Sequence, residues 1–195
     1  MQLVGNQNHV HLWRTSLDKL YVKVDNLIDK TTCDILAGGL IIREFKTPLE
    51  KFKVDKQTPG AYWSYGYTAT DSLLCYLKPK IEEVTGKRLL PTYSYARVYR
   101  NGHSLWRHID RAECEFSVTI TLRTDGTDWP IIMGDEEVII EVGSGVVYQG
   151  EKIRHERKPY DGNEHVQVFL HYVDADGPYK DNEFDKRLDV INPFC

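Results

Sequence analysis

Several features that define membrane, secreted or nucleic-acid-binding proteins are missing from this sequence. No run of about 18 apolar residues is present, as a transmembrane helix requires. Residues 1–5 show no basic segment leading into an apolar stretch, the pattern of a secretory signal. The net charge is −4, without the excess of Lys and Arg that neutralises nucleic-acid phosphates. We therefore expect a cytoplasmic protein with neither a membrane nor a nucleic-acid partner.

Paired cysteine motifs are also absent. The chain has four cysteines, and none of them forms a Cys-x-x-Cys motif: Cys33, Cys75, Cys114 and Cys195. Zinc ribbons and disulfide-rich scaffolds both need closely spaced cysteines. We expect reduced thiols, as in a cytosolic protein.

The composition that is present is typical of a globular protein. The 195 residues are 41% hydrophobic and 28% charged, which is enough for one domain with a sizeable core. No repeat or low-complexity tract interrupts the chain. We predict one domain over residues 1–195. Residues 1–90 would supply N-terminal strands and supporting helices, residues 91–174 a β-rich core, and residues 175–195 a tail.

The N-terminal part mixes strand and helix signals. Alternating polar and apolar residues predict strands at 8–14 and 20–28. A capping residue near Asp29 predicts a helix that runs to about Phe45, although two glycines inside it weaken this prediction. Residues 46–67 read as loop, and their four aromatics near the end either pack over the core or form a substrate-facing lid.

The clearest helix is predicted over Thr70–Gly86. Gly86 is a typical residue at a helix C-terminus. The apolar residues before it recur at helical spacing: Leu73, Leu74, Leu77, Ile81 and Val84. We expect this helix to cover the outside of the β-core. From residue 91 onward short strands are expected near 92–100, 114–123, 129–133, 136–142, 145–148 and 165–173. That spacing is typical of a sandwich or barrel.

A candidate metal site begins at His108. In an extended strand His108 and Asp110 point to the same face and could reach one ion. His155 is the best candidate for a third ligand, with His165 and His171 on the last strand as rivals. Two histidines and one carboxylate with open positions are typical of non-haem Fe(II) oxygenases.

The residues around this motif resemble a known family. Residues 91–122 contain an Arg-x-Tyr-x-x-Gly strand (Arg97 to Gly102), then His-x-Asp, then a β-strand. This order is similar to the metal-binding half of the 2-oxoglutarate/Fe(II)-dependent dioxygenases, in their prolyl 4-hydroxylase-like branch. Residues 148–172 resemble the half with the distal histidine. The resemblance implies a mainly β fold with flanking helices, a cupin-like jelly roll called the double-stranded β-helix, with residues 91–174 as its metal core.

The resemblance also implies a function. It makes His108, Asp110 and His155 the catalytic ligands of Fe(II), with 2-oxoglutarate and O2 as co-substrates and ascorbate as an optional reductant. Such an enzyme hydroxylates a C–H group of a peptide, a prolyl residue included, or of a small molecule, and converts 2-oxoglutarate to succinate. The alternative is a metal-binding or sugar-binding cupin module without oxygenase activity.

One position departs from the family. The distal carboxylate of 2-oxoglutarate needs a cation or several donors, which the family supplies as Lys or Arg about ten residues after the distal histidine; here that residue is His165. A protonated His165 assisted by Gln167 could replace it, or Arg97 could, since Arg97 shares a strand face with Tyr99. Tyr99 matches a family tyrosine that contacts the co-substrate. The side chains predicted to bind the co-substrate are Tyr99, Arg97, Thr119, His165 and Gln167.

Overall fold

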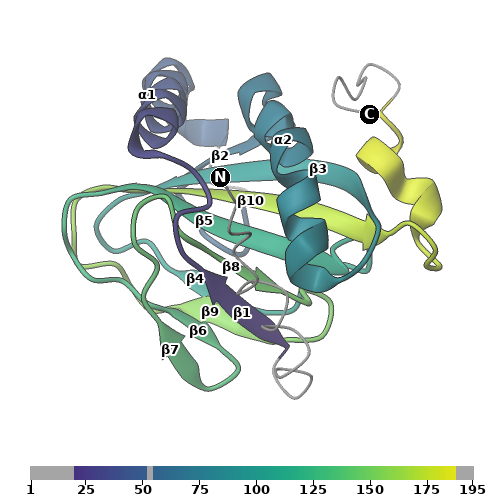
Figure 1. Cartoon of the computed structure of the whole chain (residues 1–195). Helices are drawn as coiled ribbons and strands as arrows, with labels where there is room; N and C mark the ends of the chain where they lie inside the picture. The colour runs from purple at the N-terminus through teal and green to yellow at the C-terminus, as the bar shows by residue number, and fades with distance from the viewer. Residues whose placement is uncertain (1–19, 52–54, 188–195) are drawn as a thin grey trace, which may run out of the picture.

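Two helices lie on one side of a large antiparallel sheet, and a smaller sheet lies on the other (Figure 1). This computed structural model describes residues 20–51 and 55–187. The six strands of the major sheet follow one another in this order: β1 (Tyr21–Val24), β8 (Gly145–Tyr148), β5 (Phe116–Thr124), β10 (His165–Asp174), β3 (Leu89–Tyr99) and β2 (Tyr62–Tyr65). The minor sheet contains β4 (Leu105–His108), β9 (His155–Arg157), β6 (Ile131–Met133) and β7 (Glu136–Val138). The predicted fold class, mainly β with flanking helices, is confirmed.

The central strands of the major sheet are buried on both faces, and the two faces differ in chemistry. Along β10 the apolar side chains of Val166, Val168 and Leu170 belong to the core shared with the helices. The alternating positions, from His165 and Gln167 onward, point to the opposite face. Ser117, Thr119 and Thr121 on β5 are the register partners of these positions. The space between the two sheets is therefore polar beside β5 and β10, whereas a smaller apolar cluster fills it between β6 and β8.

Both predicted helices are present. Helix α1 (Lys30–Lys46) begins at Asp29, whose carboxylate accepts a hydrogen bond of 2.9 Å from the backbone N–H of Thr32. Helix α2 (Thr68–Thr85) ends at Gly86, which adopts the left-handed conformation with φ 66°. Four leucine and isoleucine side chains of α2 are buried against the sheet, as predicted: Leu73, Leu74, Leu77 and Ile81.

The sequence-based expectations differ from the structure at short elements. The predicted loop of residues 46–67 contains the edge strand β2 and a short 3-10 helix (Leu49–Lys51). Strand β9 and a second 3-10 helix (Lys180–Lys186) were not predicted either. Three or four residues are too few to show a periodicity, and such strands form because a longer neighbour offers hydrogen bonds. The predicted strand at 8–14 and the last residues of the tail, 188–195, lie outside the described residues.

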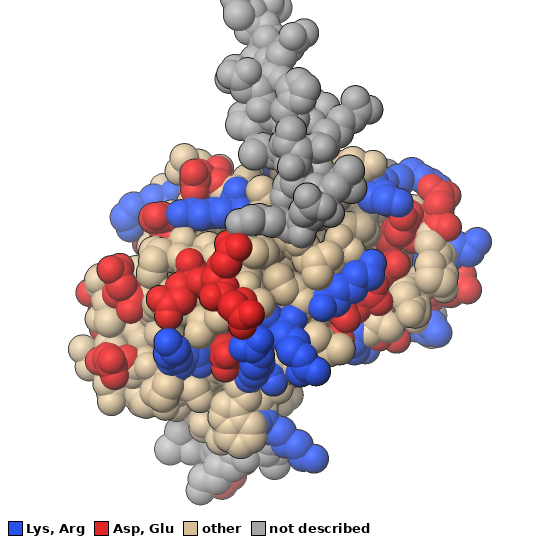
Figure 2. Space-filling view, turned by 90° about the horizontal axis from the view of Figure 1, so that it is seen from below, with Lys and Arg blue, Asp and Glu red and all other residues tan. Residues whose placement is uncertain are grey.

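The surface below the minor sheet carries charges of both signs (Figure 2). Blue Lys and Arg side chains are mixed with red Asp and Glu side chains, so the described part of this face is not uniformly positive. Among the described residues no helix combines the length and the apolar character needed to cross a membrane.

The packing of α2 generates a stability prediction. Leu77→Ala should lower the free energy of unfolding by roughly 2–5 kcal/mol, because it leaves a cavity beneath the helix. The side chain of Leu77 is only 3% exposed. Urea unfolding measures the change. Glu83→Ala, on the exposed side of the same helix, is the control and should shift the free energy by less than about 1 kcal/mol. Equal effects of the two substitutions would contradict the placement of α2.

Candidate metal centre

Strand pairing places two histidines opposite each other. His108 ends β4 and His155 begins β9, and these two residues are register partners in the minor sheet. Their ring centroids are 4.3 Å apart. Of the three histidines considered as distal ligand, His155 is therefore the one that meets His108.

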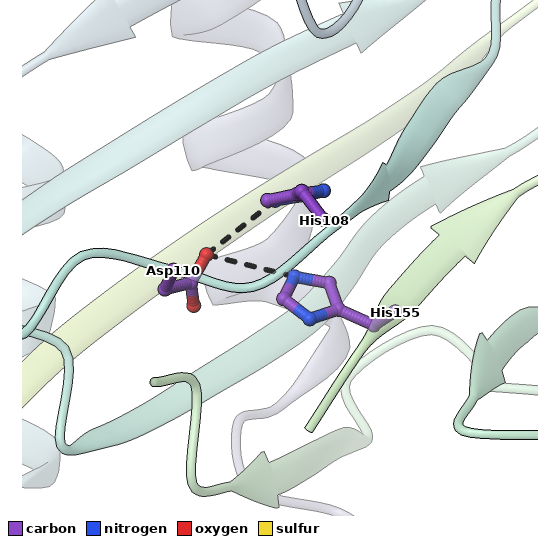
Figure 3. A group of neighbouring side chains, drawn as sticks. All are labelled: His108, Asp110 and His155. Atoms are coloured by element: carbon purple, nitrogen blue, oxygen red, sulfur yellow. Dashed lines mark ion pairs between the residues drawn. The ribbon is translucent and has the colours of Figure 1, made fainter. Parts of the chain in front are cut away.

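Asp110 completes the group from the loop after β4. Its backbone N–H donates a 2.9 Å hydrogen bond to the carbonyl of Gly150, which fixes the loop. Its Oδ1 atom lies 3.4 Å from Nε2 of His108 and 3.6 Å from Nε2 of His155, as the dashed lines of Figure 3 show. One ligand atom from each of the three residues lies within 4.8 Å of the others. The structure thus brings together the three residues predicted as ligands.

The hydrogen bonds of the two imidazoles set their tautomers. Nδ1 of His108 lies 2.7 Å from the carbonyl oxygen of Trp106, and Nδ1 of His155 lies 3.1 Å from that of Ile153. A carbonyl can only accept, so Nδ1 carries a hydrogen in both rings, and in a neutral ring Nε2 then keeps a lone pair directed at the centre. Burial lowers the pKa of His155, which keeps this ring neutral at neutral pH.

The carboxylate of Asp110 is ionised, and Ser117 and His171 hold it through hydrogen bonds. Burial tends to raise its pKa, but the close contacts with His108 and the other neighbouring histidines lower it below its ordinary value. Ser117 Oγ donates to Asp110 Oδ2 at 3.2 Å and accepts from Nδ1 of His171 at 2.8 Å. This second layer orients the carboxylate, as outer hydrogen bonds do at metal sites.

These three side chains fit a divalent first-row metal such as Fe(II). Two neutral imidazole nitrogens and one carboxylate oxygen are the donor set of non-haem iron sites. A second grouping, Asp110 with Cys114 and His171, is less suitable. Burial raises the pKa of the Cys114 thiol to about 12, so this sulfur is protonated, and Nδ1 of His171 is engaged by Ser117.

The centre opens into a cavity of about 250 Å³. Side chains from both sheets and from the loop before β2 form its walls: Asp55, Gln57, Tyr93, Tyr95, Arg97, Leu105, His108, Ile109, Asp110, Arg111, Tyr148, His155, Phe169 and His171. This volume lies just below the roughly 300–1,000 Å³ that is typical of ligand pockets.

Four of the five residues predicted to bind a co-substrate, all except Arg97, carry little or no charge. Tyr99 is completely buried on β3. Gln167 donates to Thr119 Oγ1 at 2.6 Å and accepts from Nε2 of His165 at 2.8 Å. Burial and the charge of Arg157 lower the pKa of His165 to about 3, so the protonated His165 considered from the sequence is absent at neutral pH. Because Nε2 of the neutral His165 donates to Gln167, Nδ1 carries only a lone pair and cannot donate a hydrogen bond to a carboxylate.

Arg97 lines the cavity but is already paired. Its Nη1 forms an ion pair of 2.7 Å with Asp55, and its Nη2 donates to Gln57 at 3.3 Å. Arg97 shares one face of β3 with Tyr99, as predicted. Its carboxylate partner could not be predicted from local sequence, because Asp55 lies in a loop more than 40 residues away.

Arg157 is the functional candidate that sequence reasoning missed. It is 2% exposed, stacks on Trp129 with 4.6 Å between the guanidinium carbon and the ring centroid, and donates from Nη1 to the Trp129 carbonyl. Burial lowers its pKa to about 10, which still leaves it charged at neutral pH. The spacing of two residues from His155 could have indicated it, because residues i and i+2 of a strand share one face.

Comparisons with known proteins identify the fold. Neither a family model nor a curated protein matches the sequence. A prolyl-4-hydroxylase from Pseudomonas putida is 16% identical, with 84% of this chain and 97% of that chain aligned at a TM-score of 0.63. A viral collagen prolyl hydroxylase from Paramecium bursaria Chlorella virus-1, solved with 2-oxoglutarate, is 12% identical over 79% of this chain and 96% of that chain, with a TM-score of 0.60.

A third similar structure has a different reaction. SnoK, a non-haem α-ketoglutarate-dependent carbocyclase of nogalamycin biosynthesis, is 12% identical over 89% of this chain and 85% of that chain, with a TM-score of 0.65. At these identities the likeness concerns the fold. It confirms the predicted jelly roll of the 2-oxoglutarate oxygenases.

Gly150 should be essential for metal binding. A Cβ atom at this position would lie 2.7 Å from Ser117 Oγ and 2.9 Å from the Cys114 carbonyl, and closer still to Asp110. Gly150→Ala should therefore displace the Asp110 carboxylate and weaken Fe(II) or Mn(II) binding by roughly tenfold to a hundredfold. Calorimetric titration measures this. Gly38→Ala in α1, where a Cβ meets nothing within 4 Å, is the control and should leave metal affinity unchanged.

His165 should make the protein less stable as the pH falls. The pKa of this imidazole is 6.5 in the unfolded chain and about 3 in the folded one, so between these values the unfolded state binds more protons. The free energy of unfolding should therefore decrease as the pH falls below about 6.5, by up to about 1.4 kcal/mol per pH unit from this group. Urea unfolding of wild type and His165→Gln at a series of pH values tests this. The variant should show the shallower pH dependence, and identical slopes would argue against a neutral, buried His165.

Proposed function

We propose that this protein is an Fe(II)- and 2-oxoglutarate-dependent oxygenase that hydroxylates a C–H group of a peptide. The observation that carries the proposal is the grouping of His108, Asp110 and His155 at one end of a cavity between the two sheets. Both rings use Nδ1 for a backbone carbonyl, which leaves Nε2 as the atom available to a metal, and the carboxylate is ionised. The likeness in fold to prolyl hydroxylases supports the same conclusion.

In this proposal His108, Asp110 and His155 hold the iron. Together with 2-oxoglutarate and O2, bound iron supplies the oxidising chemistry that inserts one oxygen atom into a substrate C–H bond and releases succinate and CO2. His108 and His155 come from paired strands and Asp110 from the loop after β4, and all three line the cavity in which ligands would bind. Ser117 and His171 keep the carboxylate oriented throughout. The carbonyls of Trp106 and Ile153 keep the hydrogen of each imidazole away from the metal side.

An aromatic hollow beside the cavity favours a peptide as substrate. Trp63 stacks on Tyr95 with 5.9 Å between centroids, and Tyr65 stacks on Tyr93 at 5.2 Å. The hollow is lined by Asp55, Trp63, Tyr65 and Tyr95, so it shares Asp55 and Tyr95 with the metal cavity. Aromatic-lined grooves bind extended, proline-rich segments through ring contacts. A prolyl residue at the metal with its neighbours on the aromatic rings is the arrangement that we favour.

The proposal is tested by succinate formation. With Fe(II), O2 and 2-oxoglutarate the protein should produce succinate, and Asp110→Ala should reduce the rate by at least about a hundredfold, because changes outside the ligand set already cost 10–100-fold at such sites. The control is Asp128→Ala, which should keep the wild-type rate, because the Asp128 carboxylate is exposed and does not line the cavity.

Peptides extend the same assay. Proline-rich peptides should stimulate succinate formation and gain the mass of one oxygen atom. Tight metal binding without any succinate would contradict the proposal and favour a cupin module that binds metal without oxidising a substrate.

A further inference from the structure

Arg157 is a buried cation without an acidic partner. Its Nε and Nη2 atoms are inaccessible to solvent and make no hydrogen bond, while Nη1 donates to the carbonyl of Trp129. Within residues 20–51 and 55–187 no carboxylate forms an ion pair with it. An uncompensated buried charge is strongly unfavourable, and proteins normally pair such a group or retain it for a ligand.

The surroundings of Arg157 suit an organic anion. Tyr99, Tyr148 and Tyr160 lie near its guanidinium, and Trp129 lies beneath it. The Tyr99 hydroxyl is also buried and makes no hydrogen bond of normal geometry, although the Thr58 side chain lies near it. The two unused donor atoms of Arg157, with the hydroxyl of the neighbouring Tyr99, can bind both oxygens of a carboxylate.

The position of Arg157 relates it to the metal centre. Arg157 and His155 lie on the same face of β9, two residues and therefore about 7 Å apart along the strand. This separation is comparable with the length of a five-carbon dicarboxylate. Tyr148 connects the two places, because it lines the metal cavity and also neighbours Arg157.

Other cations near the site are occupied or neutral. Arg97 is neutralised by Asp55 at 2.7 Å. His165 donates from Nε2 to Gln167, which leaves only a lone pair on Nδ1. Neither presents unused positive charge to a second carboxylate.

We propose that Arg157, assisted by the hydroxyl of Tyr99, receives the distal carboxylate of 2-oxoglutarate in this protein. The inference rests on the proposed oxygenase function. It assigns the anchoring charge to the strand of the distal histidine instead of to the last strand, where this chain has His165.

The experiment compares two ligands that differ only at the distal end. 2-Oxopentanoate has the 2-oxo acid group and the chain length of 2-oxoglutarate but ends in a methyl group. Binding of each acid to the Fe(II)-loaded protein is measured without oxygen, by calorimetry and by the metal-to-ligand charge-transfer absorption. Arg157→Met should weaken 2-oxoglutarate binding by roughly tenfold to a hundredfold, the loss expected for a charge-assisted hydrogen-bond pair, and should leave 2-oxopentanoate binding unchanged.

Two further variants control the result. Arg97→Met removes the paired cation and should affect the two acids equally. Arg157→Lys replaces a forked donor by a single ammonium and should weaken 2-oxoglutarate selectively but by less than Arg157→Met; it decides the matter if Arg157→Met does not fold.

Specific outcomes overturn the assignment. Equal losses for the two acids in the Arg157 variants, or a loss specific to 2-oxoglutarate in Arg97→Met, would place the carboxylate elsewhere. Wild-type protein that binds Fe(II) but neither acid would overturn the proposed function itself, and the inference with it, and this result differs from a selective failure at Arg157.

Discussion

The antiparallel pairing of β4 with β9 is the interaction on which the candidate site depends. It is a short pairing in the minor sheet, and its register sets His108 directly opposite His155. The chain then needs only two residues after His108 to bring the Asp110 carboxylate within 3.6 Å of Nε2 of both rings. A slip of one residue in β9 would turn His155 out of the space between the sheets, because side chains alternate along a strand. The metal site and the sheet register are therefore one structural requirement.

Packing of the helices on one face of the major sheet stabilises the fold enough for polar side chains to be buried on the opposite face. Apolar side chains on one face of β3, β5, β8 and β10 pack with α1 and α2 in the principal core. That burial stabilises the sheet and frees the opposite face for hydroxyls, amides and imidazoles. Most of these inner polar groups satisfy one another, as the contacts of Gln167 with Thr119 and His165 show. Arg97 and Asp55 neutralise each other there, whereas the charge of Arg157 has no such partner among the described residues.

The sequence predicted long elements and local motifs better than short elements and distant partners. Helix α2 and strands β3, β5 and β10 are long enough to show their periodicity, and the spacing of His108 and Asp110 is local. Strands β2 and β9 are short, and hydrogen bonds to neighbours define them. The pairing of Arg97 with Asp55 is a long-range contact that no local pattern encodes. Arg157 was overlooked because β9 is too short to be recognised as a strand, and only the strand shows that the side chains of Arg157 and His155 share one face.

His165 and Arg157 are best understood as one coupled choice. The charge of Arg157 lowers the pKa of His165, so the two side chains are close enough to sense each other in a buried environment. A lysine or arginine at position 165 would add a second cation beside the first, and two buried like charges disfavour each other. A neutral imidazole at 165 avoids this repulsion and holds Gln167 by a 2.8 Å hydrogen bond. The histidine that departs from the family pattern is thus the residue expected next to a cation supplied by β9, and the two positions should change together or not at all.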